Sequence, residues 1–229
     1  MGKEYERLQV VKSTTEIPVT PLYVNDMRHG FASDVVAGFG GTGLDYIHCR
    51  DPYNFLSGGY SLHFRTRTTG AAEGDSVFTR FAVPTIGWLK HHALFLIRRD
   101  HDNPECHTVE FQLRFADVAN DREDYYSFRF LGSLVPYYLQ VRTAAGWVTV
   151  TDMPSMAADL WLPVIAQIDV PNRRWDFVQL QNRVYDFSAY TYWASFGVAV
   201  LDQIQITLTA TKVPPADLWI DKIVVSGVE

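Results

Sequence analysis

The residues of this sequence that are best suited to chemistry are polar side chains that alternate with apolar ones along short segments. The clearest segment is Thr108–Ala116, in which Glu110, Gln112 and Arg114 alternate with apolar residues. Successive side chains of a β-strand point to opposite faces, so the three polar groups share one face and the apolar residues share the other. Carboxylate, amide and guanidinium groups gathered on one face can bind hydroxyl or carboxylate groups of a ligand.

Several other segments repeat this alternation and enlarge the set of candidate residues. The polar residues predicted on the outer faces are His63, Arg65, Arg67, Glu110, Gln112, Arg114, Tyr125, Arg129, Tyr138, Gln140 and Arg142. If the strands are neighbours, these residues form one continuous polar face. Arginine and glutamine suit carboxylate or hydroxyl ligands, and tyrosine can stack on a sugar ring while its hydroxyl forms hydrogen bonds. The alternative is an ordinary solvated or partner-covered face of an antiparallel sheet.

We assign two kinds of role within this set. Glu110, His63 and Tyr138 are the candidate catalytic residues, because a polysaccharide lyase or hydrolase needs a base and the arginines could stabilise charge. The candidate ligand-binding residues are Arg65, Arg67, Gln112, Arg114, Tyr125, Arg129, Gln140, Arg142 and Trp193. Trp193 follows an aromatic segment without strand alternation, where either sugar stacking or a buried anchor is expected. The other five tryptophans, among them Trp147, are expected mostly in the core.

The elements that must position these residues are strands. The predicted strands are Tyr60–Thr68, Val77–Val83, Ala93–Arg98, Thr108–Ala116, Tyr125–Leu131, Tyr137–Arg142, Trp147–Val150, Trp161–Val170, Trp175–Gln181, Val184–Phe187, Val198–Thr211 and Asp217–Ser226. Hairpin follows hairpin at the spacing typical of an all-β sandwich, with almost no helix. No shift in composition divides the chain, so we expect one antiparallel domain over residues 1–229.

Three segments do not follow the strand pattern. Met1–Pro21 is interpreted as an arm or a first edge strand. The glycine-rich segment Leu22–Gly43 is interpreted as a flexible loop rather than a phosphate cradle, because no helical period follows it. Thr151–Leu160 is the one plausible helix, a short one at most, with Asp152 as its N-cap.

Composition and charge exclude some classes of function. The net charge of −6 argues against a nucleic-acid partner, which requires a basic surface. Met1–Thr20 lacks the apolar stretch of a signal peptide, and no apolar run is long enough to cross a membrane. These features favour a cytoplasmic protein, unless the start of the chain was trimmed. Cys49 and Cys106 are expected as two free thiols, with a disulfide between them as the alternative.

Part of the sequence is similar to a known family. From Ile168 to Ser188 a strand ends in Asp169, a hairpin follows, and Trp175 opens the next strand. The final segment, Leu218–Ser226, reads L-W-I-D-K-I-V-V-S, with an aspartate before a β-branched run. Both patterns resemble those of concanavalin-A-like lectin/glucanase jelly rolls. The resemblance covers residues 161–226, and residues 60–150 agree more loosely.

This resemblance implies a jelly-roll β-sandwich whose relatives include sugar-binding modules, β-glucanases and polysaccharide lyases. The glucanase branch carries Glu-x-Asp-x-x-Glu on one strand, whereas Glu110 is the single carboxylate of its strand here. A double-displacement glycosidase of that branch is therefore disfavoured. The resemblance also implies one structural calcium ion, with Asp221 and Asp26 as its ligands.

The sequence therefore predicts a carbohydrate-binding β-sandwich module whose site is the polar face. The first alternative is a polysaccharide lyase or glycoside hydrolase that uses the same face. The second is a structural protein without glycan binding, whose polar face contacts another copy in a homo-oligomer.

Overall fold

The structure is a computed structural model, and it describes residues 19–25, 36–42, 47–51, 53, 55–56, 59–70, 72–83, 90–99, 107–131, 137–153, 160–196, 203–211 and 216–228. Apart from one 3-10 turn at Val118–Asn120, all the regular elements in these residues are strands. The strands are β1 (Val19–Asn25), β2 (Val36–Gly41), β3 (Ile47–Asp51), β4 (Ser61–Arg65), β5 (Ser76–Ala82), β6 (Lys90–Arg99), β7 (His107–Asp117), β8 (Arg122–Leu131), β9 (Tyr137–Thr143), β10 (Gly146–Met153), β11 (Trp161–Asp169), β12 (Arg174–Leu180), β13 (Arg183–Asp186), β14 (Trp193–Phe196), β15 (Gln203–Ala210) and β16 (Asp217–Val228).

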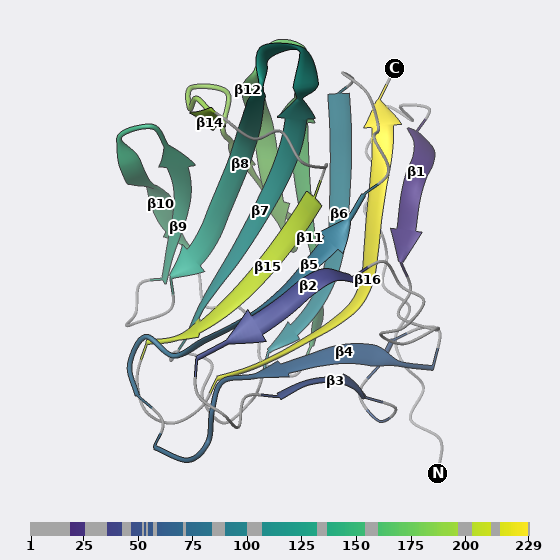
Figure 1. The fold of residues 1–229 in the computed structure, drawn as a ribbon, viewed down its shortest axis with the longest axis vertical. Helices are drawn as coiled ribbons and strands as arrows, with labels where there is room; N and C mark the ends of the chain where they lie inside the picture. Colours follow the sequence, from purple (N-terminus) through teal and green to yellow (C-terminus); the bar gives the residue numbers. More distant parts are fainter. Residues whose placement is uncertain are drawn as a thin grey trace.

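These strands form two antiparallel sheets, as Figure 1 shows. The first, here called sheet A, has the order β13-β12-β11-β6-β16-β4-β3, and β1 also pairs with β16. The second, sheet B, has the order β10-β9-β8-β7-β15-β5-β2, and β14 also pairs with β8. The all-β sandwich predicted from the sequence is confirmed. Among the described residues, there is no helix of the length and apolar character needed to cross a membrane.

The alternation of β7 decides which of its side chains face the interior. Val109, Phe111 and Leu113 are buried, whereas Glu110 and Gln112 on the opposite face are partly exposed. The neighbouring strands β8 and β15 alternate in register with β7, so apolar residues meet on one face of sheet B and polar residues on the other. The alternation predicted for Thr108–Ala116 is confirmed.

Aromatic side chains join the two sheets in the core. Phe111 of sheet B lies 4.8 Å from Phe95 of sheet A and 5.1 Å from Phe128, measured between ring centres. Trp175 of sheet A is fully buried and meets Tyr126 of sheet B edge to face at 5.5 Å. Tilted and edge-to-face ring pairs such as these add to the free energy gained by burying apolar surface.

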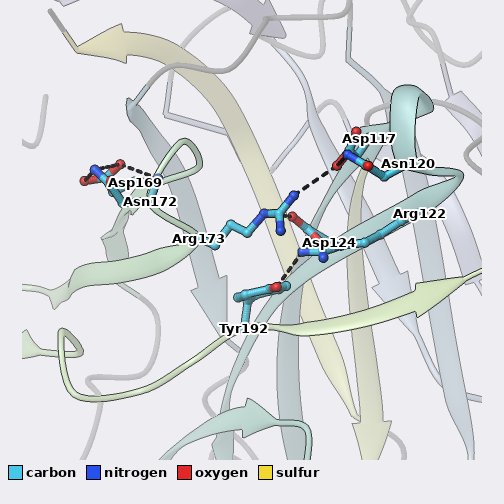
Figure 2. A network of polar contacts seen from close by, with 8 residues as sticks. All are labelled: Asp117, Asn120, Arg122, Asp124, Asp169, Asn172, Arg173 and Tyr192. Carbon is cyan, nitrogen blue, oxygen red and sulfur yellow. Dashed lines mark hydrogen bonds and ion pairs between the residues drawn. The ribbon is translucent and has the colours of Figure 1, made fainter.

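Ion pairs close one end of the sandwich, as Figure 2 shows. Arg173, in the turn between β11 and β12 of sheet A, reaches Asp117 at 3.0 Å and Asp124 at 3.6 Å in sheet B. Arg122 donates a hydrogen bond from Nε to the other oxygen of Asp124 at 2.6 Å and also contacts Tyr192. Both aspartates are buried, so these arginines compensate charges that would otherwise lie in the interior without a partner.

Two of the three segments that lacked a strand pattern differ from their interpretation. Residues 151–153 continue strand β10 rather than starting a helix, and residues 154–159 lie outside the described part of the chain. The glycine-rich segment contributes strand β2, which includes Gly38, Gly40 and Gly41. A Cβ atom on Gly40 would lie 2.7 Å from Cζ of Phe78, so glycine is what lets this ring lie against the strand. Residues 1–18 of the proposed arm are outside the described residues, and β1 begins at Val19.

Truncation of Phe111 tests whether the contact between the sheets carries the stability of the fold. We expect Phe111→Ala to lower the free energy of unfolding by about 4 kcal/mol, because the cavity opens at the junction of the two sheets. Chemical denaturation measures this change. Val184→Ala is the matched control, because Val184 is 62% exposed and its truncation opens no cavity. A loss at Phe111 no larger than at Val184 would contradict this account of the core.

Candidate functional site

The continuous polar face predicted from the sequence is divided between the two sheets. Strand β4, which carries His63 and Arg65, lies in sheet A, whereas β7, β8 and β9 lie side by side in sheet B. The outer faces of the two sheets point away from each other across the core. The condition that the strands are neighbours is therefore not met for β4, and His63 does not share a face with Glu110 and Tyr138. The cause is that β4 pairs with β16, more than 150 residues later in the chain.

The three predicted residues in and after β4 are instead bound to buried carboxylates. His63 Nε2 lies 2.6 Å from Oδ1 of Asp217, and Arg65 donates from Nε to the same oxygen at 2.7 Å. Arg67 donates to Asp75 at 2.7 Å. Asp217 is 3% exposed and Asp75 is 5% exposed. These contacts fasten strands and a turn to each other, so they explain the three residues by the fold rather than by a ligand.

The remaining predicted residues share the outer face of sheet B. Strand register places Glu110 beside Arg129 and Arg129 beside Gln140, so these three side chains form a row across β7, β8 and β9. A second row places Arg114 beside Tyr125, which is paired in turn with Trp193 of β14. We call this surface the arginine–aromatic face, defined by Glu110, Gln112, Arg114, Glu123, Tyr125, Arg129, Tyr138, Gln140, Arg142, Trp147 and Trp193.

Three arginines and three aromatic rings on this face form one continuous series of contacts, in the order Arg114, Tyr125, Trp193, Arg142, Trp147 and Arg129. Arg114 lies over the ring of Tyr125 at 5.0 Å, measured from the guanidinium carbon to the ring centre, and Tyr125 stacks on Trp193 at 4.0 Å and 12°. Arg142 lies 5.9 Å from the ring of Trp193 and 5.7 Å from that of Trp147. Arg129 covers Trp147 at 4.1 Å. Such cation–π contacts attract each guanidinium group to the rings beside it.

Local strand geometry explains why Arg142 lies between two tryptophans. The hairpin turn between β9 and β10 pairs Arg142 with Trp147 on the same face. Strand β9 pairs with β8 only as far as Val141 opposite Phe128, and β14 takes the same edge of β8 from Tyr125 onward. Arg142 therefore lies where β14 replaces β9 beside β8, within reach of Trp193 of β14 and of Trp147 of β10.

The three arginines differ in how many of their hydrogen-bond donors are already used. Arg114 donates to Glu123 at 2.5 Å, to Gln203 at 3.0 Å and to the Tyr125 hydroxyl at 3.3 Å. Tyr125 itself donates to Glu123. Arg114 is thus a structural residue that holds Tyr125 in its stack. Its predicted role as a ligand donor has no support in this geometry.

Arg129 and Arg142 keep most of their donors. Arg129 donates from Nε to Gln140 at 2.8 Å, and Gln140 donates in turn to Thr149 at 3.1 Å. Within the described part of the chain, Arg142 forms its ring contacts but no hydrogen bond or ion pair. Burial lowers the pKa of Arg129 against the opposing effect of Glu110, and the nearby charge of Arg142 lowers this pKa further.

Glu110 is the carboxyl group at the centre of the face. It forms no hydrogen bond with any described residue. Burial raises the pKa of Glu110, and the nearby charges of Arg129 and Arg142 oppose that rise. Tyr138 lies on the same face, paired with Leu131 across β8 and β9, and Gln112 donates to Ser127 at 3.2 Å. Of the three predicted catalytic residues, only Glu110 and Tyr138 therefore lie on the same face, two strands apart.

Two residues of the face were missed from the sequence. Trp147 was assigned to the core, although the two-residue turn after Thr143 pairs it with the outward Arg142. That hairpin register was the signal that could have placed it. Glu123 lies before the predicted strand Tyr125–Leu131, but the structure includes it in β8, which begins at Arg122. Trp193 was expected in a loop and instead begins strand β14.

The predicted calcium ligands are only partly described. Asp221 is fully buried at a bulge of β16 and accepts a hydrogen bond from the backbone N–H of Leu56 at 2.5 Å. Asp26 lies outside the described residues. Among the residues that are described, no group of three or more His, Cys, Asp or Glu side chains is arranged to hold a metal ion. The calcium site stays a prediction, as does the state of Cys49 and Cys106, because Cys106 also lies outside the described residues.

Comparison with known proteins identifies the fold but no family. No family model matches the sequence, and no curated protein is significantly similar to it. Solved structures do match over most of the chain. The cellulose-induced protein Cip1 has a TM-score of 0.56 at 10% identity, covering 89% of this chain and 96% of its own.

Two further solved structures have the same fold. The endo-1,3-β-glucanase of Streptomyces sioyaensis has a TM-score of 0.50 at 10% identity, covering 92% of this chain and 97% of its own. The carbohydrate recognition domain of Emp47p has a TM-score of 0.52 at 11% identity, with the same two coverages. The chain therefore has the concanavalin-A-like lectin/glucanase jelly-roll fold that the resemblance implied. At these identities the likeness concerns the fold alone.

The cluster around Asp217 generates a prediction about stability and pH. Desolvation raises the pKa of Asp217, but hydrogen bonds from His63 and Arg65 outweigh it and hold the pKa below its usual value. A carboxyl group with a lowered pKa in the folded state stabilises the fold above the unfolded-state pKa, and this stabilisation is lost as the pH falls through the folded-state pKa.

We therefore expect Asp217→Asn to lower the free energy of unfolding by about 2 kcal/mol at pH 7, because two charged hydrogen bonds are weakened. The difference from the wild type should shrink as the pH falls below the ordinary range of aspartate. Chemical denaturation of the wild type and the variant, at pH 7 and at a pH below the ordinary pKa of aspartate, measures this difference. An equal loss at neutral and acidic pH would mean that the carboxylate charge does not stabilise this cluster.

Proposed function

We propose that the protein binds carbohydrate on the arginine–aromatic face of sheet B. The observation that carries this proposal is the series of arginine and ring contacts that ends at Trp147 and Arg129. Its part from Trp193 to Arg129 holds two indole rings and two guanidinium groups on an outer sheet face. Both tryptophans remain partly exposed, and they are the kind of side chain that packs against a sugar ring.

Polar groups around the stack supply the second requirement of sugar recognition. Sugar hydroxyls need donors and acceptors at fixed positions, and Gln140, Gln112 and Ser127 lie on the same face as the rings. Gln140 is fixed from one side by Arg129 and from the other by Thr149. Side chains fixed in this way lose less conformational entropy when a ligand binds.

The fold also supports the proposal. Solved proteins with this fold are described as an endo-1,3-β-glucanase and as a carbohydrate recognition domain. Both descriptions concern carbohydrate, although neither protein shares more than 11% of its residues with this chain. The fold supports carbohydrate binding in general, and the side chains of the arginine–aromatic face support this face as the site.

One observation favours a second candidate, an enzyme that cleaves polysaccharide on the same face. Burial raises the pKa of Glu110, and the group has two arginines nearby. A carboxyl group in that setting suits proton transfer. His63 is no longer part of this hypothesis, because it lies on the other sheet. Release of an unsaturated product or of reducing ends from a bound polymer, abolished by Glu110→Gln, would establish the enzyme.

Truncation of Trp147 tests the binding proposal. We expect Trp147→Ala to weaken binding of whichever glycan a glycan array identifies by about tenfold, because a stacking surface is lost and Arg129 loses its support. Isothermal titration with the identified glycan measures the change, and chemical denaturation checks that the variant is folded.

Trp161→Ala is the matched control, because Trp161 lies on sheet A and is also partly exposed. It should leave the affinity unchanged. A loss of equal size in both variants would place the site away from the arginine–aromatic face. A folded protein that binds no glycan on a broad array would refute the proposed function.

A further inference from the structure

We infer that the sugars recognised on the arginine–aromatic face carry carboxylate groups, and that Arg142 is the residue that selects them, with Arg129 beside it. This inference rests on the proposed function and narrows it to acidic polysaccharides of the uronate type. Three features of the face carry it: unused hydrogen-bond donors, an excess of positive charge among the described side chains, and guanidinium groups that lie against aromatic rings.

The donors of Arg142 are the first feature. A guanidinium group has five N–H donors, all lying in its plane. The guanidinium carbon of Arg142 lies 5.7 Å from the ring centre of Trp147 and 5.9 Å from that of Trp193. In the described part of the chain, the Arg142 guanidinium has no hydrogen-bond acceptor. It is therefore a cation beside two rings whose donors are unused among the described residues.

Arg129 adds a second set of donors next to the first. Its Nε is bound to Gln140, and its two terminal nitrogens have no acceptor among the described residues. Both guanidinium groups contact the ring of Trp147, at 4.1 Å for Arg129 and 5.7 Å for Arg142. The two guanidinium groups therefore lie close enough to each other to contact the same ring. By contrast, Arg114 already donates hydrogen bonds to Glu123, Gln203 and Tyr125.

The local charge is the second feature. Arg114 and Glu123 neutralise each other at 2.5 Å. Arg129 and Arg142 then face one carboxyl group, Glu110, with which neither forms an ion pair. Among the described side chains, this part of the face therefore has an excess of positive charge, in a protein whose net charge is −6. A local charge opposite in sign to that of the whole chain favours an anionic ligand.

The geometry of the donors is the third feature, and it distinguishes a carboxylate from other anions. A planar carboxylate matches the planar fork of a guanidinium group, and the pair forms two parallel hydrogen bonds. The flanking tryptophans restrict the positions open to the Arg142 side chain, so less conformational freedom is lost on binding. Uronate residues in a polysaccharide present such a carboxylate beside a sugar ring that can pack on the exposed part of an indole.

The main comparison is between two polymers that differ only in their carboxylates. Polygalacturonate is titrated into the protein beside the same polymer after full methyl esterification, and dextran sulfate serves as a polyanion without carboxylates. We expect the affinity for polygalacturonate to exceed that for the ester by at least about tenfold, since a charged bidentate pair is lost in the ester. The difference should narrow as salt is added.

Four variants assign the effect to individual residues. Arg142→Gln should lower the affinity for polygalacturonate by about tenfold, and Arg142→Lys should recover only part of it, because lysine keeps the charge without the fork. Glu110→Gln should strengthen binding by about fivefold, because it removes the carboxylate that competes for the same arginines. Arg183→Gln is the matched control, since Arg183 is an exposed arginine on sheet A. It should change nothing.

The outcomes separate this inference from the proposed function. Equal binding of the acid and its ester, lost in Trp147→Ala, would support carbohydrate binding and overturn the selection of carboxylates. Dextran sulfate bound as tightly as polygalacturonate, or full rescue by Arg142→Lys, would show general polyanion binding and overturn the role of the guanidinium fork. If neither these polymers nor any glycan of the array is bound by the folded protein, both proposals fail.

Discussion

The packing of Phe111 against Phe95 across the core is the interaction on which the rest of this molecule depends. It turns one face of β7 inward, and the period of two along a strand then turns Glu110, Gln112 and Arg114 outward. A slip of one residue in this strand would bury the polar row and expose the phenylalanines. Because β8, β9 and β15 are paired in register with one another or with β7, the same contact orients the rest of the arginine–aromatic face.

This dependence explains which parts of the structure could be predicted from the sequence. The direction of each side chain is a local property of its strand, so the outward positions of Arg129, Gln140 and Arg142 follow from alternation alone. Membership of a sheet is not local. His63 alternates just as Glu110 does, but β4 pairs with a strand near the end of the chain, and no local pattern reveals that pairing. The all-β sandwich was therefore predictable, whereas the grouping of its polar residues was not.

The groups that each arginine contacts also depend on residues far away in the sequence. Arg65 is bound by Asp217, which is 152 positions later, and Arg114 by Gln203, which is 89 positions later. Neither partner can be assigned before the strand order is known. Arg142 looks the same as these two in the sequence, and only the structure shows that its described neighbours are rings rather than carboxylates. The difference between a structural arginine and a candidate binding arginine is thus a result of tertiary structure.

The contrast between arginines paired with carboxylates and Arg129 and Arg142, which form no ion pair with a described residue, indicates which ligand the arginine–aromatic face favours. Arg173 and Arg65 stabilise the fold through ion pairs. Each is paired with a buried carboxylate, Asp117 for Arg173 and Asp217 for Arg65. Placing Arg129 near Arg142 costs free energy through repulsion, and burial of Arg129 adds to that cost. The charge of Glu110 and the ring contacts offset part of this cost. A pair of cations held in this way gains most from an anion that arrives from outside, and this is the physical argument for an acidic ligand on this sheet.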